Sequence, residues 1–219
     1  MSEQSSSGFT VFLDANVLVK PVTRTLIMAS AKSSGYGVRW SAYVESEAVR
    51  NARLGQKSIV EVRGLSGDEL SPSGINPDRF DGTSEKDRQV LADAESAGCL
   101  FLVTEDVDDF GLSDLDLVGV AAVNPDLFLS LCTTAEGYIE ALTLMTSRFR
   151  NPEHTLDQLH SQLGKAHPLT VAKYQFLFSV EPIQSTHNQP RIMYRGTRCL
   201  VCLGTRSTIT QGRCPDCTE

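Results

Sequence analysis

The amino-acid sequence predicts an α/β protein with a central parallel sheet, and three observations support this class. Short, unbroken apolar runs occur at Phe9–Leu13 and at residues 100–103 and 117–123, as expected for strands that are buried on both faces. Stretches with a helical spacing of apolar residues lie between these runs. Residue types that start and stop helices flank the stretches. Strands that alternate with helices in this way favour a parallel sheet with right-handed crossovers.

Three helices are expected between the strands, over residues 22–32, 43–54 and 85–97. Ser41 precedes the second helix and is a typical N-cap residue. Gly98 follows the third helix and is a typical residue for ending one. Both capping residues therefore agree with the helix limits that the apolar spacing predicts.

Two further segments have a distinct composition. Residues 57–86 are rich in glycine, serine and proline, and we expect a hairpin followed by a long loop there. Residues 134–180 show helical spacing, with Thr155 and Gln158 placed to form a capping box. The helical stripes of this second segment are expected to pack against the α/β part.

These patterns divide the chain into three parts. We expect an α/β domain with a helical extension, then a proline-containing linker, and finally a compact cysteine module. The expected boundaries are 8–180 for the domain (extension 134–180), 181–198 for the linker and 199–217 for the module.

Charge is distributed unevenly along the 219 residues. Hydrophobic residues make up 41% of the chain and charged residues 21%, which is enough apolar material for a folded core. The formal net charge of −7 by itself argues against a polyanionic partner. However, residues 191–219 contain five arginines and two acids, a net charge of +3, which leaves −10 on the rest. The acidic body and the basic tail therefore need separate explanations.

The expected setting is the cytoplasm, without a membrane. The sequence has no apolar run of 18 residues or more, and its polar first residues lack the pattern of a signal peptide. Two of the six cysteines are isolated and four are clustered, which differs from a secreted disulfide framework. The four histidines, which we expect at the surface, are His154, His160, His167 and His187.

Acidic residues follow two of the predicted strands. Asp14 ends the first apolar run and Asp106 comes shortly after the second. Side chains just beyond the carboxyl ends of parallel strands line the ligand crevice of an open sheet. An isolated aspartate in such a place is equally often a helix cap or a turn residue. Two of them at matching positions favour a shared site.

Further acids lie on helices that reach the same edge. Glu47 shares a helical face with apolar residues, whereas Glu45 is expected to point to solvent. Asp87 lies in the first turn of the third helix, where stabilisation of the helix dipole is the simpler explanation. Asp93, farther along that helix, is expected at the surface.

A cluster of such carboxylates predicts a divalent cation. Without one, the charges would repel each other and raise their own pKa values. Oxygen ligands of this kind select Mg²⁺ or Mn²⁺, and such an ion activates water and binds phosphate oxygens. Hydrolysis of a phosphodiester is the chemistry that follows. The sequence has no Walker A, G-x-G-x-x-G or G-x-S-x-G motif, so nucleotide-binding and serine-hydrolase classes are poorly supported.

Residues 9–180 resemble the PIN-domain nucleases, especially the branch of toxins in type II toxin–antitoxin systems. The resemblance rests on FLDANVLV around Asp14, on residues 41–47, on KDRQVLADA around Asp87, on LVTEDVDDF around Asp106 and on NPDLFL from Asn124. It implies a three-layer α/β/α fold with a central parallel sheet. It also implies an endoribonuclease that uses Mg²⁺ or Mn²⁺ and has RNA as its substrate. An antitoxin protein is the implied partner if the chain acts as a toxin, and a homodimer is a further possible assembly.

The resemblance assigns roles to individual residues. It implies that four acids bind the ion and are catalytic, namely Asp14, Glu47, Asp87 and Asp106. Asn16 and Thr104 would assist them, and Asp109 is an alternative fourth ligand. Residues 57–86 depart from the family pattern, in which more helix is expected.

The C-terminal cysteines form two C-x-x-C pairs separated by eleven residues: Cys199, Cys202, Cys214 and Cys217. This spacing predicts one tetrahedral structural Zn²⁺ in a zinc ribbon, with disulfides or redox-active thiols as alternatives. A module this short has almost no core of its own, so the metal would stabilise its fold. The arginines that could contact RNA phosphates are Arg195, Arg198, Arg206 and Arg213. A structural cap or a protein-docking module is an equally good interpretation of the tail.

Two functions remain in competition at this stage. The first is a cytoplasmic, metal-dependent ribonuclease, acting either as a toxin or as a stand-alone processing enzyme. The second is a non-catalytic adaptor that binds RNA or protein with a PIN fold and a zinc ribbon. The cluster of acids favours the enzyme, because an adaptor has no need of it.

Overall fold

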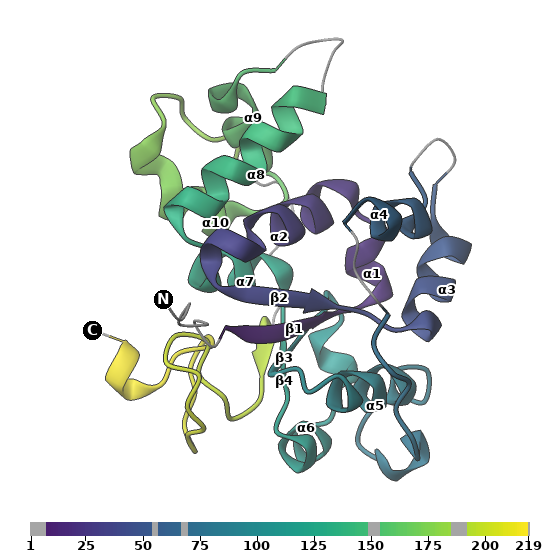
Figure 1. Ribbon diagram of the computed structural model, residues 1–219. Helices are drawn as coiled ribbons and strands as arrows, with labels where there is room; N and C mark the ends of the chain where they lie inside the picture. The colour runs from purple at the N-terminus through teal and green to yellow at the C-terminus, as the bar shows by residue number, and fades with distance from the viewer. Residues whose placement is uncertain (1–7, 54–56, 67–69, 149–153, 185–191, 219) are drawn as a thin grey trace, which may run out of the picture.

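The computed structural model describes residues 8–53, 57–66, 70–148, 154–184 and 192–218. Its centre is a five-stranded sheet in the order β2-β1-β3-β4-β5 (Figure 1). The first four strands are parallel and β5 is antiparallel to β4. The strands are β1 (Phe9–Leu13), β2 (Tyr36–Arg39), β3 (Phe101–Val103), β4 (Ala121–Val123) and β5 (Tyr194–Arg195). The predicted α/β class with a mainly parallel sheet is therefore confirmed.

Ten α-helices connect and cover these strands within the described part of the chain. Figure 1 shows α2 and α8 on one side of the sheet and α5 and α6 on the other. The helices are α1 (Ala15–Leu18), α2 (Pro21–Ser34), α3 (Ala42–Asn51), α4 (Ile59–Ser66), α5 (Arg88–Ser96), α6 (Leu112–Val118), α7 (Pro125–Cys132), α8 (Ala135–Arg148), α9 (Leu156–Leu163) and α10 (Pro168–Tyr174). Short 3₁₀ helices are η1 (Pro77–Arg79), η2 (Val107–Asp109), η3 (Gln175–Leu177) and η4 (Pro215–Cys217). No helix in these ranges is both long and apolar enough to cross a bilayer.

The order of the strands creates a switch point between β1 and β3. The chain leaves β1 toward β2 on one side, and it leaves β3 toward β4 on the other. Val11 is paired with Val38 of β2 and with Phe101 of β3, so the two central strands are in register. A crevice forms where connections from neighbouring strands diverge, beyond their carboxyl ends. Ligand-binding side chains are therefore expected just after Leu13 and Val103.

The core fills both faces of the sheet, as the unbroken apolar runs predicted. Phe12, Leu13 and Phe101 are fully buried, and burial of such a side chain stabilises the fold by roughly 1.5–3 kcal/mol. On one side the ring of Tyr36 makes an edge contact with that of Phe128, with 5.1 Å between centroids. The helical extension belongs to this core, because α2 packs along α8 and α7 packs along α10.

Several expected caps are present. Ser41 caps α3 by accepting the Val44 N–H at 3.3 Å, and Gly98 adopts a left-handed φ of 65° after α5. Thr155 and Gln158 form the predicted capping box of α9. Local side-chain chemistry therefore sets these helix ends, as the sequence indicated.

Three expected elements differ from the structure. The apolar run 117–123 is divided, because Gly119 ends α6 with a left-handed φ of 67° and only Ala121–Val123 forms a strand. The hairpin expected within 57–86 is wrong for its described part, which contains α4 and η1. Part of the expected linker is strand β5, which pairs Arg195 with Ala122. Strand β2 was not predicted, because its YGVR sequence has only two apolar side chains.

Candidate functional site

Asp14 lies at the switch point, immediately after β1. Its Oδ1 accepts the Ala15 N–H at 2.6 Å, which caps α1. Its Oδ2 accepts the hydroxyl of Thr104 at 2.7 Å, across from the end of β3. Burial raises the pKa of Asp14 to about 7, and the nearby charges of Asp87 and Glu47 add to this effect although the hydrogen bonds oppose it. A cation that binds beside such a carboxyl group stabilises its charged form.

The Asn16 side chain joins the ends of the two central strands. Its Nδ2 lies 2.9 Å from Asp14 Oδ2, 3.0 Å from Thr104 Oγ1 and 3.1 Å from Asp106 Oδ2. Its Oδ1 accepts the Glu105 N–H at 3.2 Å. The same amide thus contacts two predicted metal ligands that are far apart in the sequence. Asp14 and Asp106 are brought together, with both predicted supporting residues between them.

Asp87 approaches from the start of α5. Its Oδ2 accepts the hydroxyl of Ser84 and lies 3.7 Å from Lys86 Nζ. Lys86 Nζ is also 2.9 Å from Asp109 Oδ2, so one ammonium group connects two of the predicted acids. Burial is the main cause that raises the pKa of Asp87, and the charges of Asp109 and Glu47 contribute. Lys86 was not predicted as a site residue, although its position beside Asp87 was a usable signal.

Glu47 is half-buried on α3 and faces the same group of charges. Its charge raises the pKa values of Asp14, Asp87 and Tyr43. In the described ranges only the four C-terminal cysteines bring three or more ligand atoms close enough together to hold one metal ion, and the four acids do not. Mg²⁺ usually takes only one or two carboxylates and keeps several waters.

Two acids expected at the surface are buried instead. Glu45 Oε2 accepts the indole N–H of Trp40 at 3.1 Å and the Arg63 Nε–H at 2.9 Å. Asp93 is fully buried, and its Oδ1 accepts the Gly74 N–H at 2.7 Å. Gly74 lies so close to α5 that a Cβ there would come within 2.1 Å of the Ala92 backbone. Glu45 joins α3 to α4, and Asp93 fixes the loop at Gly74 onto α5, which a helical wheel alone does not reveal.

Glu45→Ala is expected to reduce stability by roughly 1–3 kcal/mol, because the buried Trp40 N–H would lose its acceptor. Glu47→Ala, two residues along the same helix, is expected to leave the free energy of unfolding nearly unchanged. Urea unfolding of the two variants would separate these roles. Equal stability loss in both variants would contradict the assignment.

Two of the histidines are also buried, contrary to expectation. His160 Nδ1 lies 3.0 Å from the Tyr138 hydroxyl, and His167 Nε2 lies 3.1 Å from Thr23 Oγ1. Burial lowers the pKa of His167 to about 4. Both rings therefore belong to the packing of the helical extension, while His187 lies outside the described residues.

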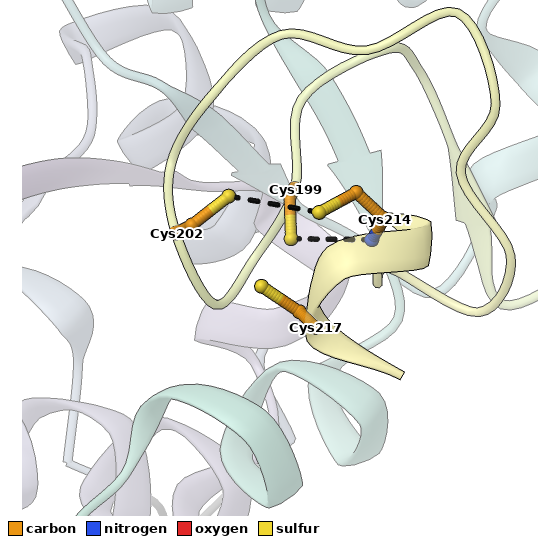
Figure 2. Close-up of side chains that lie close together, drawn as sticks. All are labelled: Cys199, Cys202, Cys214 and Cys217. Carbon is orange, nitrogen blue, oxygen red and sulfur yellow. Dashed lines mark hydrogen bonds between the residues drawn. The ribbon is translucent and has the colours of Figure 1, made fainter. Parts of the chain in front are cut away.

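The four C-terminal cysteines converge on one point (Figure 2). All four sulfur atoms lie within 4.8 Å of one another, and those of Cys202 and Cys214 are 3.8 Å apart. A tetrahedral zinc ion with Zn–S bonds of about 2.3 Å needs sulfur atoms about 3.8 Å apart. No disulfide joins them. The cluster therefore fits a structural zinc site, as the spacing predicted.

Backbone donors favour the thiolate form of Cys199. Its Sγ accepts the N–H groups of Val201 at 3.4 Å and of Cys214 at 3.3 Å. Burial raises the pKa of Cys199, but the backbone N–H groups of Cys202, Cys214 and Val201, together with the Cys202 side chain, lower it to about 6. Zinc binds cysteine as thiolate, so the turn that carries the first C-x-x-C pair is already organised for a metal.

The arginines of the tail contact the protein itself. Arg195 Nη1 donates to the carbonyl oxygens of Asp108 and Phe110, and Arg198 Nε donates to that of Gly119. Within the module, Arg213 Nη1 donates to the Cys217 carbonyl at 2.9 Å. Arg206 Nη1 donates to the Thr205 carbonyl, and its Nη2 lies 3.5 Å from Asp216.

Comparisons of the chain with protein-family models, with curated proteins and with solved structures find no match. The chemical assignment of the site therefore rests on its own residues. These are a group of acids at the switch point, with Asn16 and Thr104 between two of them, and a four-cysteine cluster at the edge of the sheet.

Proposed function

We propose that this chain is a metal-dependent endoribonuclease that hydrolyses phosphodiester bonds, with Mg²⁺ or Mn²⁺ as the active-site ion. The observation that carries this proposal is the pairing of Asp14 and Asp106 through Asn16 at the switch point. The raised pKa of Asp14 adds support, since a buried carboxylate beside other acids is a favourable cation ligand. The resemblance to toxin-type PIN nucleases makes RNA the proposed substrate and an antitoxin the proposed partner.

Each residue would have a defined role in this reaction. Asp14, Glu47, Asp87 and Asp106 would hold the ion, with Asp109 next to them. A bound divalent cation supplies an activated water and neutralises charge on the phosphate. The Thr104 hydroxyl and the Asn16 amide hold the Asp14 carboxylate in place. Lys86 offsets part of the negative charge of Asp87 and Asp109.

The proposed reaction can be tested with labelled single-stranded RNA. Purified full-length protein should cleave it in Mn²⁺ or Mg²⁺, and EDTA should stop the reaction. Asp87→Asn and Asp106→Asn should each reduce the rate on the order of 10²-fold, because ligand loss weakens metal binding and misplaces the reacting groups. Asp78→Asn, at an exposed position in η1, is the matched control and should retain the rate.

Three outcomes would count against the enzyme. These are cleavage that continues in EDTA, equal rates in all three variants, or binding of RNA without any cleavage in either metal. The last result would favour the adaptor. Co-purification with an antitoxin would test the toxin assignment separately from the chemistry.

A further inference from the structure

Arg195 links the cysteine module to the acidic site. It lies in β5, where it pairs with Ala122 of β4. Its guanidinium reaches the segment that follows Asp106, with Nη1 3.2 Å from the Asp108 carbonyl oxygen and 2.8 Å from that of Phe110. Its Nη2 lies 3.9 Å from the Asp108 carboxylate. One side chain thus contacts the middle and the end of a short turn.

This turn, residues 106–110, carries two of the acids assigned to the metal site. Asp106 begins it, and Asp109 lies in η2. Its other ties lead to the Asp87 region, since the Ser84 N–H donates to the Asp109 carbonyl at 2.8 Å and Lys86 contacts the Asp109 carboxylate. The position of the turn therefore affects three of the predicted acids at once.

The module contacts β5 through Tyr194, the neighbour of Arg195. The Arg206 N–H donates to the Thr197 carbonyl at 2.7 Å, and the Cys199 N–H donates to that of Gly204 at 2.8 Å. The Tyr194 hydroxyl donates to the Arg198 carbonyl. The Tyr194 bond joins β5 to the residue before Cys199, and the other two bonds hold residues 197–206, which carry Cys199 and Cys202, in one folded loop. A two-residue strand has little stability of its own, so its place depends on the module.

We propose that zinc in the four-cysteine cluster orders strand β5, and that Arg195 transmits this order to residues 106–110 as a positioning residue for the acidic site. Loss of zinc is then expected to make residues 106–110 less ordered, although none of the acidic residues is changed. The link from the turn to the divalent cation rests on the proposed function, whereas the link from zinc to the turn does not. The arginine acts through backbone carbonyls and makes no contact with the reacting groups.

Hydrogen exchange in the full-length zinc-loaded protein tests the first link. In Arg195→Gln, and in Cys202→Ser without zinc, the amides of Ser84 and residues 109–111 should exchange about tenfold faster, the effect of losing roughly one net hydrogen bond. Arg195→Lys keeps a donor near the same carbonyls and should recover part of the protection. Arg148→Gln, at an exposed site on α8, should match the wild type.

Binding of Mn²⁺, followed by electron paramagnetic resonance, tests the second link. Affinity should fall several-fold in Arg195→Gln and partly recover in Arg195→Lys, with zinc content unchanged in both. Unchanged exchange in Arg195→Gln would overturn the proposal, even if zinc loss unfolded the chain. Faster exchange in both Arg195→Gln and zinc-free Cys202→Ser, in a protein whose wild type does not bind Mn²⁺, would support the zinc link and reject the proposed metal site.

Discussion

Asp14→Asn is expected to reduce metal-dependent RNA cleavage by ~10²–10³-fold, the loss usual when a group that stabilises charge in the transition state is removed. The chain should still fold, because an amide oxygen can keep the cap on Ala15. The amide nitrogen, however, would meet the donating amide of Asn16. The change therefore removes the negative charge and disturbs the bridge to Asp106.

The same substitution should change how stability depends on pH. The pKa of Asp14 is raised from its usual 3.8 to about 7, so between these values the folded state holds a proton that the unfolded state has released. The free energy of unfolding of the metal-free protein therefore falls as pH rises from about 4 to about 7. Above about pH 7, Asp14 is ionised in both states and no longer changes the stability. Asp87, whose pKa is also raised, acts in the same direction.

Thermal unfolding would measure this effect. In the wild type, Mn²⁺ should raise the melting temperature strongly at pH 8 and much less at pH 5.5, where a proton already neutralises Asp14. Asp14→Asn should flatten the pH dependence and lose most of the response to Mn²⁺. A variant that keeps both would show that Asp14 is a helix cap and not a metal ligand.

Removal of zinc is the second change with a large expected effect. Structural zinc contributes roughly 10–16 kcal/mol to the folding of zinc-finger peptides, and the module here is similarly small. Zinc binding should also stabilise the α/β domain, because Leu200 packs into its core and β5 is the last strand of its sheet. A loss of even about 3 kcal/mol would lower the melting temperature by roughly 10 °C.

Metal analysis and calorimetry would test this prediction. The wild type should contain one zinc per chain, and Cys202→Ser should lose it together with part of the thermal stability. Cys99→Ala, which removes a buried cysteine outside the cluster, should keep its zinc. Zinc loss with an unchanged melting temperature would mean that the module folds independently of the domain.

The sequence predicted those features that depend on local chemistry. The limits of strand β1 were predicted correctly because the unbroken apolar run Phe9–Leu13, which stops before Asp14, has no helical spacing. The cysteine cluster followed from its spacing. Glu45, Asp93 and His160 were misplaced because their partners come from distant segments, and local periodicity carries no information about such contacts.

Some contacts of the acidic site were predictable from the sequence and others were not. The strand ends indicated that Asp14 and Asp106 would meet, and Asn16 contacts both. The position of Lys86 beside Asp87 was a usable signal, whereas its contact with Asp109 and the role of Arg195 depend on where η2 lies in space. The four tail arginines were grouped as possible RNA contacts because only their charge was visible; in the structure each donates to backbone carbonyls of the chain.

Strand β5 covers one edge of the sheet. Without it, the outer edge of β4 would present unpaired N–H and C=O groups from an apolar strand, which is the usual template for aggregation between sheets. Two residues of β5 pair with this edge, Tyr194 with Val123 and Arg195 with Ala122. A chain truncated before Ile192 is therefore expected to aggregate more readily, an effect that does not depend on the proposed activity of the acids.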